Sequence, residues 1–224
     1  MSRSKEDSVP FLQELAGAGF VAVGFDAWQH GERATESGER ILERVFGGFR
    51  RHMWPILGQT TLDALRVIDW AIAELGAGPE VVAGGVSMGG DVAVALAGVD
   101  ERVARVAAIV STPDWTRPGM RDLADPSSVL PQGKADAYAR WFYERLDPLA
   151  HVEAYARGPA IAFECGADDT HVPADGAQRF RAALGEAYPR AAERVRVTVH
   201  AEVGHIDGGR SEALLRRCLT WFDP

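Results

Sequence analysis

The sequence contains few of the residues that build disulfide frameworks or metal centres. It has two cysteines, Cys165 and Cys218, and each lies in an apolar pattern typical of a buried strand or a buried helix. Two such residues do not make a disulfide framework, and nothing near them has the spacing of metal ligands. No pair among His52, His151 and His200 has the i, i+4 spacing of a helical metal site. The residue pattern therefore does not indicate a metal centre.

Lysine is almost absent, and acidic residues outnumber basic ones. Only Lys5 and Lys134 are lysines, and the formal net charge is −8. This balance argues against nucleic acid and anionic membranes as main partners. There is also no long apolar segment, so we predict no signal peptide and no transmembrane helix, and a soluble cytoplasmic protein is the default expectation. The sequence leaves a homodimer open.

Length and hydrophobic patterning predict one α/β domain over residues 1–224. Short apolar runs indicate five strands that alternate with helices, at 20–25, 81–85, 103–110, 159–165 and 194–200. This alternation is typical of a mostly parallel, doubly wound sheet with helices on both faces. The last run alternates apolar and polar residues, which suits a strand near the edge of the sheet.

Helices are expected between these strands, together with one insertion. Apolar spacing predicts helices around 11–15, 40–46, 60–75, 175–187 and 211–222. Thr60 or Thr61 is expected to cap the third helix, with Trp54-Pro55 starting a separate segment before it. Residues 114–158 are rich in Pro, Asp, Trp and Arg, with one helix near 135–146. We interpret them as an insertion or cap over the mouth of a site.

The most informative stretch is Gly85-Val86-Ser87-Met88-Gly89, between a predicted strand and a predicted helix. A serine at such a turn is held out of the sheet, because the flanking glycines lack the Cβ atoms that would collide with the neighbouring backbone. The amide of Met88 then points into the same space from a helix N-terminus. A plain Gly-rich turn is the alternative interpretation of this motif.

Two further loops carry an acid and a histidine at the ends of predicted strands. The strand at 159–165 is followed by Asp168 and Asp169, and the strand at 194–200 by Gly204-His205. Reactive groups collect at the carboxyl ends of parallel strands. A serine hydroxyl needs a base, and an imidazole needs a carboxylate to fix its tautomer. These residue types therefore predict a Ser-His-Asp site, with either aspartate as the acid.

Together, Gly85-x-Ser87-x-Gly89, Gly166-x-x-Asp169-x-x-Val172-Pro173 and Gly204-His205 resemble the α/β-hydrolase fold. The likeness is greatest to small bacterial serine esterases of the dienelactone-hydrolase and peptidase-like branch. It implies Ser87 as the nucleophile, His205 as the base, Asp169 as the acid and the Met88 amide as an oxyanion donor. Hydrolases of this kind need no metal or organic cofactor.

One departure from the family pattern concerns the oxyanion site. The resemblance implies a central strand that ends in His-Gly-Gly or a similar motif and supplies a second oxyanion amide. Here the sequence starts at Met1, about where that loop would end. The N-terminal strands are therefore expected to be missing. An upstream start, a sheet that closes up without the strand, and another chain covering the gap all remain open.

These patterns predict a serine hydrolase that cleaves a small-molecule ester or another acyl substrate. A thioesterase, an amidase or peptidase, or an acyltransferase would use the same triad. A hydrolase-like binding protein with weak or no activity is the alternative of another class. Trp28 and Trp115 flank predicted loops and are candidates for substrate binding, with simple packing as the other interpretation. His30 and His171 lie in loops near the same face; we interpret them as solvated residues, with a place in the lining of the pocket as the alternative.

Overall fold

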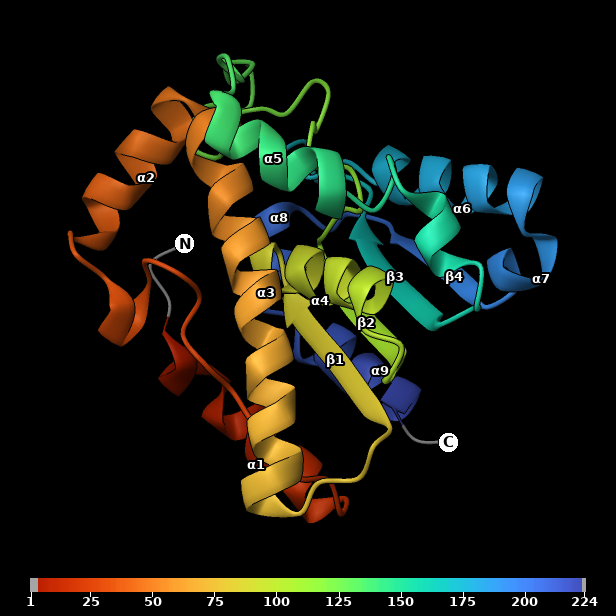
Figure 1. Ribbon diagram of the computed structural model, residues 1–224. Helices are drawn as coiled ribbons and strands as arrows, with labels where there is room; N and C mark the ends of the chain where they lie inside the picture. The colour runs from red at the N-terminus through yellow and green to blue at the C-terminus, as the bar shows by residue number, and fades with distance from the viewer. Residues whose placement is uncertain (1–3, 223–224) are drawn as a thin grey trace.

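A parallel sheet of four strands forms the centre of the computed structural model, which describes residues 4–222 (Figure 1). The strands are β1 (Val81–Val86), β2 (Val103–Ile109), β3 (Ala160–Gly166) and β4 (Val195–His200). They lie in the order β1-β2-β3-β4, and every neighbouring pair is parallel. Because the strands all run in one direction, the loops that follow them meet at a single edge of the sheet.

Helices cover both faces of this sheet (Figure 1). On one face α3 (Phe49–Leu75), α4 (Met88–Val99) and α6 (Asp175–Ala187) contribute to a common apolar cluster. On the other face α9 (Glu212–Phe222) packs mainly on β2. Alternate residues of β2 serve the two faces, as the pleat of a strand requires: Val106 and Ala108 join the first cluster, Ala107 and Ile109 the second. The predicted doubly wound α/β architecture is confirmed.

The prediction of a strand at 20–25 is wrong. These residues have no regular secondary structure, although Phe20 and Phe25 pack against the apolar clusters on opposite faces of the sheet. β1 pairs only with β2, so within residues 4–222 its other edge has no strand beside it. An apolar run becomes a strand only when a neighbouring strand completes its hydrogen bonds, and here none lies alongside. Residues 20–25 therefore do not extend the sheet beyond β1.

The helix predicted to start at Thr60 or Thr61 begins eleven residues earlier than Thr60. Helix α3 runs from Phe49 and contains Pro55 in its interior. Thr60 and Thr61 do not cap a helix, because their hydroxyls donate to the carbonyls of residues 56 and 57, one turn back. Pro55 removes one backbone hydrogen bond, but the residues around it are buried against the cap, and this packing outweighs the loss. The helix ends as predicted, at Gly76 with φ of 67°.

The remaining predicted elements are present with small shifts in their bounds. The longer helices include α1 (Val9–Gly17), α2 (Gly38–Gly47) and α5 (Ala137–Leu146), and β4 lies at the edge of the sheet as its alternation indicated. Shorter helical turns are η1 (Lys5–Ser8), η2 (Gly31–Arg33), η3 (Val152–Tyr155), α7 (Pro189–Ala192) and α8 (His205–Gly208).

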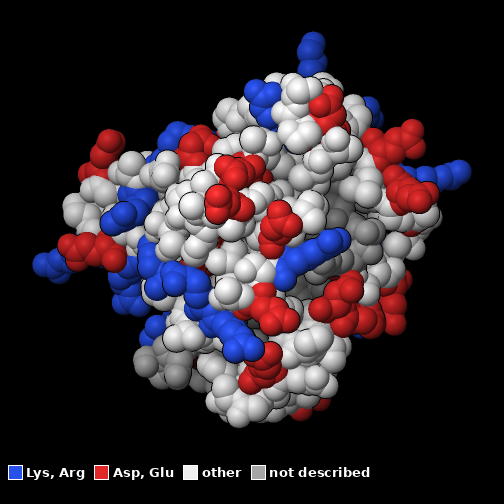
Figure 2. Space-filling model, turned by 180° about the vertical axis from the view of Figure 1, so that it is seen from behind, with Lys and Arg blue, Asp and Glu red and all other residues white. Residues whose placement is uncertain are grey.

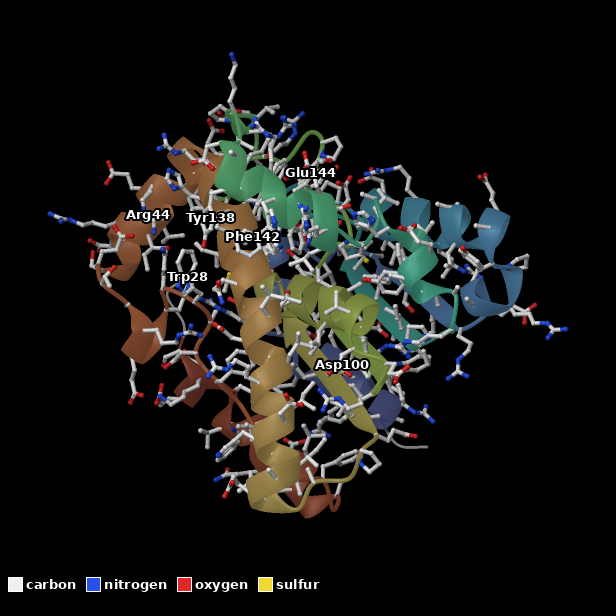
Figure 3. The ribbon with its side chains drawn as sticks, viewed as in Figure 1. Trp28, Arg44, Asp100, Tyr138, Phe142 and Glu144 are labelled. Atoms are coloured by element: carbon white, nitrogen blue, oxygen red, sulfur yellow. The ribbon has the colours of Figure 1, made fainter. Side chains whose placement is uncertain are left out.

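Residues 114–158, called the cap segment from here on, cover the N-terminal half of α3. Their α5 lies across this part of α3 in Figure 1, and Figure 3 shows Phe142 of α5 over the same helix. The contact is close because α3 has a glycine at position 58, where a Cβ atom would collide with the Phe142 ring. Trp54 of α3 adds a bond from its indole N–H to the Trp115 carbonyl at 2.9 Å and stacks on Tyr143. The cap segment is therefore fixed on α3.

Acidic and basic side chains lie next to one another on one face of the molecule. On the face that Figure 2 shows, acidic and basic groups lie side by side rather than in one extended basic area. No helix among residues 4–222 combines the length and the apolar character that crossing a membrane requires.

A buried ion pair joins the cap segment to α4. Asp91, in the first turn of α4, and Arg117, in the cap segment, contact each other directly, and both side chains are at most 2% exposed. Asp91 also accepts a hydrogen bond from the Thr112 amide at 2.8 Å. Burial raises the pKa of Asp91, and the nearby guanidinium opposes this rise. Removing one partner would leave the other charge buried and unpaired.

We expect Arg117→Met to lower the free energy of unfolding by about 3–5 kcal/mol, because the Asp91 carboxylate would stay buried without an opposite charge. The double variant Asp91→Asn/Arg117→Met should cost clearly less than the sum of the two single changes. Urea unfolding of the four proteins measures this coupling. Additive effects below about 1 kcal/mol each would contradict a structural role for the pair.

Candidate active site

Ser87 lies at a strained turn between β1 and α4. Its backbone has φ of 53° and ψ of −121°, a conformation that L-residues rarely adopt. The turn is possible because residue 85 is glycine: a Cβ atom there would collide with the backbone of Gly89. The Ser87 amide donates to the Ile109 carbonyl of β2 at 2.8 Å, and Ser111 donates to the Ser87 carbonyl at 2.9 Å. The neighbouring strand therefore holds the strained residue in place.

The three residues predicted as a triad lie in direct contact. The Oγ atom of Ser87 is 3.0 Å from Nε2 of His205, and Nδ1 of His205 is 2.8 Å from Oδ2 of Asp169. A carboxylate can only accept, so Nδ1 carries the hydrogen and Nε2 is left with a lone pair toward the serine hydroxyl. The Asp169 side chain is fully buried and that of His205 is 10% exposed. This is the geometry in which an imidazole can take the serine proton.

The loop after β3 decides between the two candidate acids. Oδ1 of Asp169 accepts from the amides of His171 and Val172, at 3.0 and 2.7 Å, which orients its other oxygen toward His205. Asp168 is exposed, and its side chain makes no hydrogen bond with the described residues. The structure therefore brings Asp169, and not Asp168, to the histidine.

Backbone hydrogen bonds join the loop after β3, which carries Asp169 and is called the acid loop, to the loop after β4, which carries His205 and is called the histidine loop. The Ala167 amide donates to the His200 carbonyl at 2.8 Å, and the Asp168 amide to the Val203 carbonyl at 3.1 Å. The Val203 carbonyl also lies where a Cβ atom at Gly166 would be, so only glycine allows this approach. The two loops pack as one unit at the carboxyl edge of the sheet.

The Met88 amide is the first N–H of α4, directly after Ser87. The amides of Gly90 and Asp91 bond to the Ser87 carbonyl, whereas no bond is formed by the Met88 amide within residues 4–222. The first amides of a helix lack acceptors within it, and the helix dipole favours negative charge there. The Met88 N–H is thus available to a developing oxyanion beside Ser87.

The two tryptophans proposed for substrate binding lie in different surroundings. Trp28 is half-buried and packs against the same apolar cluster as Met88 and Phe46; Figure 3 shows it between α2 and α3. Its amide donates to the Thr60 hydroxyl at 3.0 Å. Trp115 is fully buried within the cap segment, so its ring fills the core and presents no surface to a substrate. Packing is the role that its position supports.

His30 and His171, interpreted from the sequence as solvated, are buried, with 3% and 5% of their surfaces exposed. Burial lowers the pKa of both imidazoles, that of His171 to about 4. Nδ1 of His30 bonds to the Trp28 carbonyl at 2.9 Å. His171 packs beside His205, with 4.9 Å between the ring centroids. The interpretation as solvated residues was wrong, because contacts with segments distant in sequence cover these loops.

The neighbours of His171 could not be predicted from the sequence. Phe46 of α2 packs edge-on against the ring, and the Arg121 carbonyl accepts from its Nδ1–H at 2.8 Å. An apolar residue on a helix indicates only packing, and a backbone carbonyl leaves no mark in a sequence pattern. Among residues 4–222 no group of three or more His, Cys, Asp or Glu side chains is placed to hold a metal ion.

Comparisons with known proteins give one family match and several structural neighbours. Residues 48–224 match the model of the prolyl oligopeptidase family. Protein TT1662 of Thermus thermophilus is 23% identical, with a TM-score of 0.66 over 98% of this chain and 85% of that one. A monoacylglycerol lipase of Paleococcus ferrophilus is 17% identical, with a TM-score of 0.63 over 99% of this chain and 90% of that one. A search of curated proteins finds no match.

Some structural neighbours are much longer than this chain. A puromycin-hydrolysing peptidase of Mycobacterium tuberculosis is 19% identical, with a TM-score of 0.51. The alignment covers 74% of this chain but only 24% of that protein. The neighbours show the α/β-hydrolase fold that the three sequence motifs implied, so the expected fold family is confirmed.

Asp169→Asn should lower kcat/KM for p-nitrophenyl acetate by a factor on the order of 10⁴, because an amide favours the wrong tautomer of His205. Asp168→Asn is the matched control in the adjacent position and should stay within about twofold of the parent. Steady-state kinetics of the three proteins tests the assignment. An equal loss in both variants, or a loss only at Asp168, would show that Asp169 is not the acid.

Proposed function

Because the chain belongs to the prolyl oligopeptidase family, we propose that it is a serine hydrolase that works through an acyl-enzyme. For reasons of the oxyanion site given below, we propose carboxylic esters as its substrates. The observation that carries the proposal is the continuous chain of contacts from Ser87 through His205 to the buried Asp169. The strained turn at Ser87 adds to it, since such strain is typical of a nucleophile held out at the top of a sheet.

In the first half of the proposed reaction Ser87 attacks the ester carbonyl. His205 takes the hydroxyl proton on Nε2 as the Oγ–C bond forms, and Asp169 stabilises the resulting imidazolium. The carbonyl oxygen becomes negative and accepts from the Met88 amide. When the tetrahedral intermediate collapses, His205 returns the proton to the alkoxy oxygen. The alcohol departs, and the acyl group stays on Ser87.

In the second half a water molecule replaces the alcohol. His205 removes a proton from the water, which attacks the acyl carbonyl, and the second tetrahedral intermediate collapses with Oγ as the leaving group. The proton held on His205 returns to Ser87, and the carboxylic acid leaves. Every proton in both halves passes through Nε2 of one imidazole, so no metal or organic cofactor takes part.

The Met88 amide is the one oxyanion donor that we assign. Enzymes of this type use two donors, and removing one typically costs 10²–10³ in kcat. The resemblance to α/β-hydrolases places the second donor after a strand on the far side of β1, an edge that is open among the described residues. We therefore expect a polypeptide that consists of residues 1–224 alone to have a low kcat for a serine hydrolase.

Amide or peptide hydrolysis is the second candidate, and the family match favours it. Its support is the name of the matched family and of a structural neighbour, the puromycin-hydrolysing peptidase. We favour the ester because amide cleavage is the more demanding reaction, and a weak oxyanion site penalises it more. The lipase neighbour matches nearly the whole length of this chain and acts on an ester. The substrate is expected to be a small molecule.

A fluorophosphonate probe should add one adduct mass to the chain, at Ser87. Intact-mass spectrometry of the parent and of Ser87→Ala, treated alike, measures this reaction. The alanine variant should remain unmodified because it lacks the hydroxyl that lies against His205 Nε2. Ser111→Ala is the matched control, since that hydroxyl lies nearby but donates to backbone carbonyls; it should still be labelled.

An unlabelled parent would point to the rival hypothesis, a hydrolase-like binding protein. An equal adduct on Ser87→Ala would remove Ser87 from the mechanism.

Oxygen esters should be cleaved faster than anilides of the same acyl group, and thioesters are compared alongside them. We expect kcat/KM for p-nitrophenyl acetate to exceed that for p-nitroacetanilide by at least about 10²-fold, because amide cleavage is the more demanding reaction and a weak oxyanion site penalises it more. The comparison uses one acyl chain length throughout, with Ser87→Ala as the blank. A preference for the anilide would make the peptidase the better assignment, and a preference for the thioester would make it a thioesterase.

A further inference from the structure

His171 occupies the space between the catalytic histidine and the cap side of the site. Its ring centroid is 4.9 Å from that of His205, at an interplanar angle of 61°, and 5.5 Å from that of Phe46, at 88°. Its amide donates to Oδ1 of Asp169 at 3.0 Å. One residue therefore contacts both the acid and the base of the triad, and none of the proposed steps uses it.

A pair of reciprocal bonds ties His171 to the cap segment. The Arg121 amide donates to the Thr170 carbonyl at 2.9 Å, and Nδ1–H of His171 donates to the Arg121 carbonyl at 2.8 Å. Arg121 lies 50 residues before His171 in the chain, so these bonds join two distant segments. Any displacement of Arg121 relative to the acid loop would therefore move the ring that packs on His205.

The surroundings of His171 keep its imidazole neutral. Burial is the largest cause and lowers its pKa to about 4, and the positive charge of Arg117 acts in the same direction. The charged or titratable groups that face it are Arg117 from the cap segment, His205 from the histidine loop and Asp169 from its own loop. Phe46, from α2, carries no charge. Because a carbonyl accepts from Nδ1, the hydrogen is on that atom.

We propose that His171 is a positioning residue, which sets the orientation of His205 according to the placement of the cap segment. This inference rests on the proposed triad. His205 must present Nε2 to Ser87 while its Nδ1 bonds to Asp169. The His171 ring packs against the His205 ring and so limits its rotation away from this orientation. A neutral neighbour also allows His205 to become an imidazolium during the reaction, which a second cation would oppose.

Three variants separate the parts of this role. His171→Phe keeps a ring against His205 but loses the bond to Arg121, whereas His171→Asn keeps a donor near Nδ1 and loses the ring. We expect each to lower kcat for an activated ester by about tenfold, and His171→Ala by up to about 10²-fold, with KM changed less than threefold. A loss in kcat at constant KM is the expected result, because the ring acts through His205.

His171→Lys tests the need for a neutral neighbour. A positive charge beside His205 disfavours its imidazolium, so the pKa that limits kcat/KM on the acid side should fall by about one unit. The acid limb of the pH profile therefore moves to lower pH. His151→Lys is the matched control, since His151 lies partly exposed and bonds only to Glu153 and the Glu144 carbonyl; its profile should equal that of the parent.

Histidine-ring NMR gives a readout that does not need catalysis. In the parent the His171 ring should stay neutral down to about pH 5, and His171→Phe should shift the ring signals of His205 while circular dichroism stays unchanged. If the parent hydrolyses no ester yet these signals shift, the positioning role stands and the proposed function fails. Values of kcat within twofold of the parent in all three variants, with unmoved His205 signals and an unmoved acid limb in His171→Lys, would overturn the inference.

Discussion

Parallel pairing of the strands is the constraint on which the candidate site depends. Ser87, Asp169 and His205 are separated by up to 118 residues, yet each follows a strand that runs in the same direction. In a parallel sheet such positions fall at one edge, so the loops need only short reaches to bring the side chains into contact. The sheet is stabilised by apolar clusters on both faces, and neither cluster includes a member of the triad. The residues that stabilise the sheet are thus largely different from those proposed to carry out the reaction.

The parts that the sequence predicted well depend on local patterns. Gly85 before the serine is required by the turn, because a Cβ atom there would collide with the Gly89 backbone, whereas a Cβ atom at Gly89 would meet no neighbour. The choice of Asp169 over Asp168 came from the resemblance to α/β-hydrolases, since the residues alone left both open. The failures have non-local causes. A strand at 20–25 required a neighbour that the described chain does not provide, and Pro55 lies inside a helix because packing against the cap outweighs one lost hydrogen bond. His171 was interpreted as solvated because the residue that covers it lies 50 positions away.

Buried polar contacts, in addition to apolar packing, connect the cap segment to the candidate site. Asp91 and Arg117 join it to the first turn of the helix after Ser87, and the bonds of Arg121 to Thr170 and to His171 join it to the acid loop. Apolar packing tolerates small sliding movements, whereas a buried ion pair loses its compensation when its atoms separate. The cap segment is therefore held in one position relative to the triad. A substrate-binding surface formed by this segment would then be presented to Ser87 at a fixed distance.

The edge of β1 that has no strand beside it within residues 4–222 concerns the stabilisation of the oxyanion more than the placement of Ser87. Ser87 is held by the Ile109 carbonyl and the Ser111 hydroxyl on the β2 side and by the first amides of α4. None of these bonds depends on a strand at the other edge of β1, which has no neighbour within residues 4–222. The triad bonds likewise run toward β3 and β4. The charge on the substrate oxygen, in contrast, is met by the Met88 amide alone among the groups that we assign. Nucleophile activation and oxyanion stabilisation are therefore structurally separable here, and Ser87 can acquire a reactive hydroxyl even where turnover is slow.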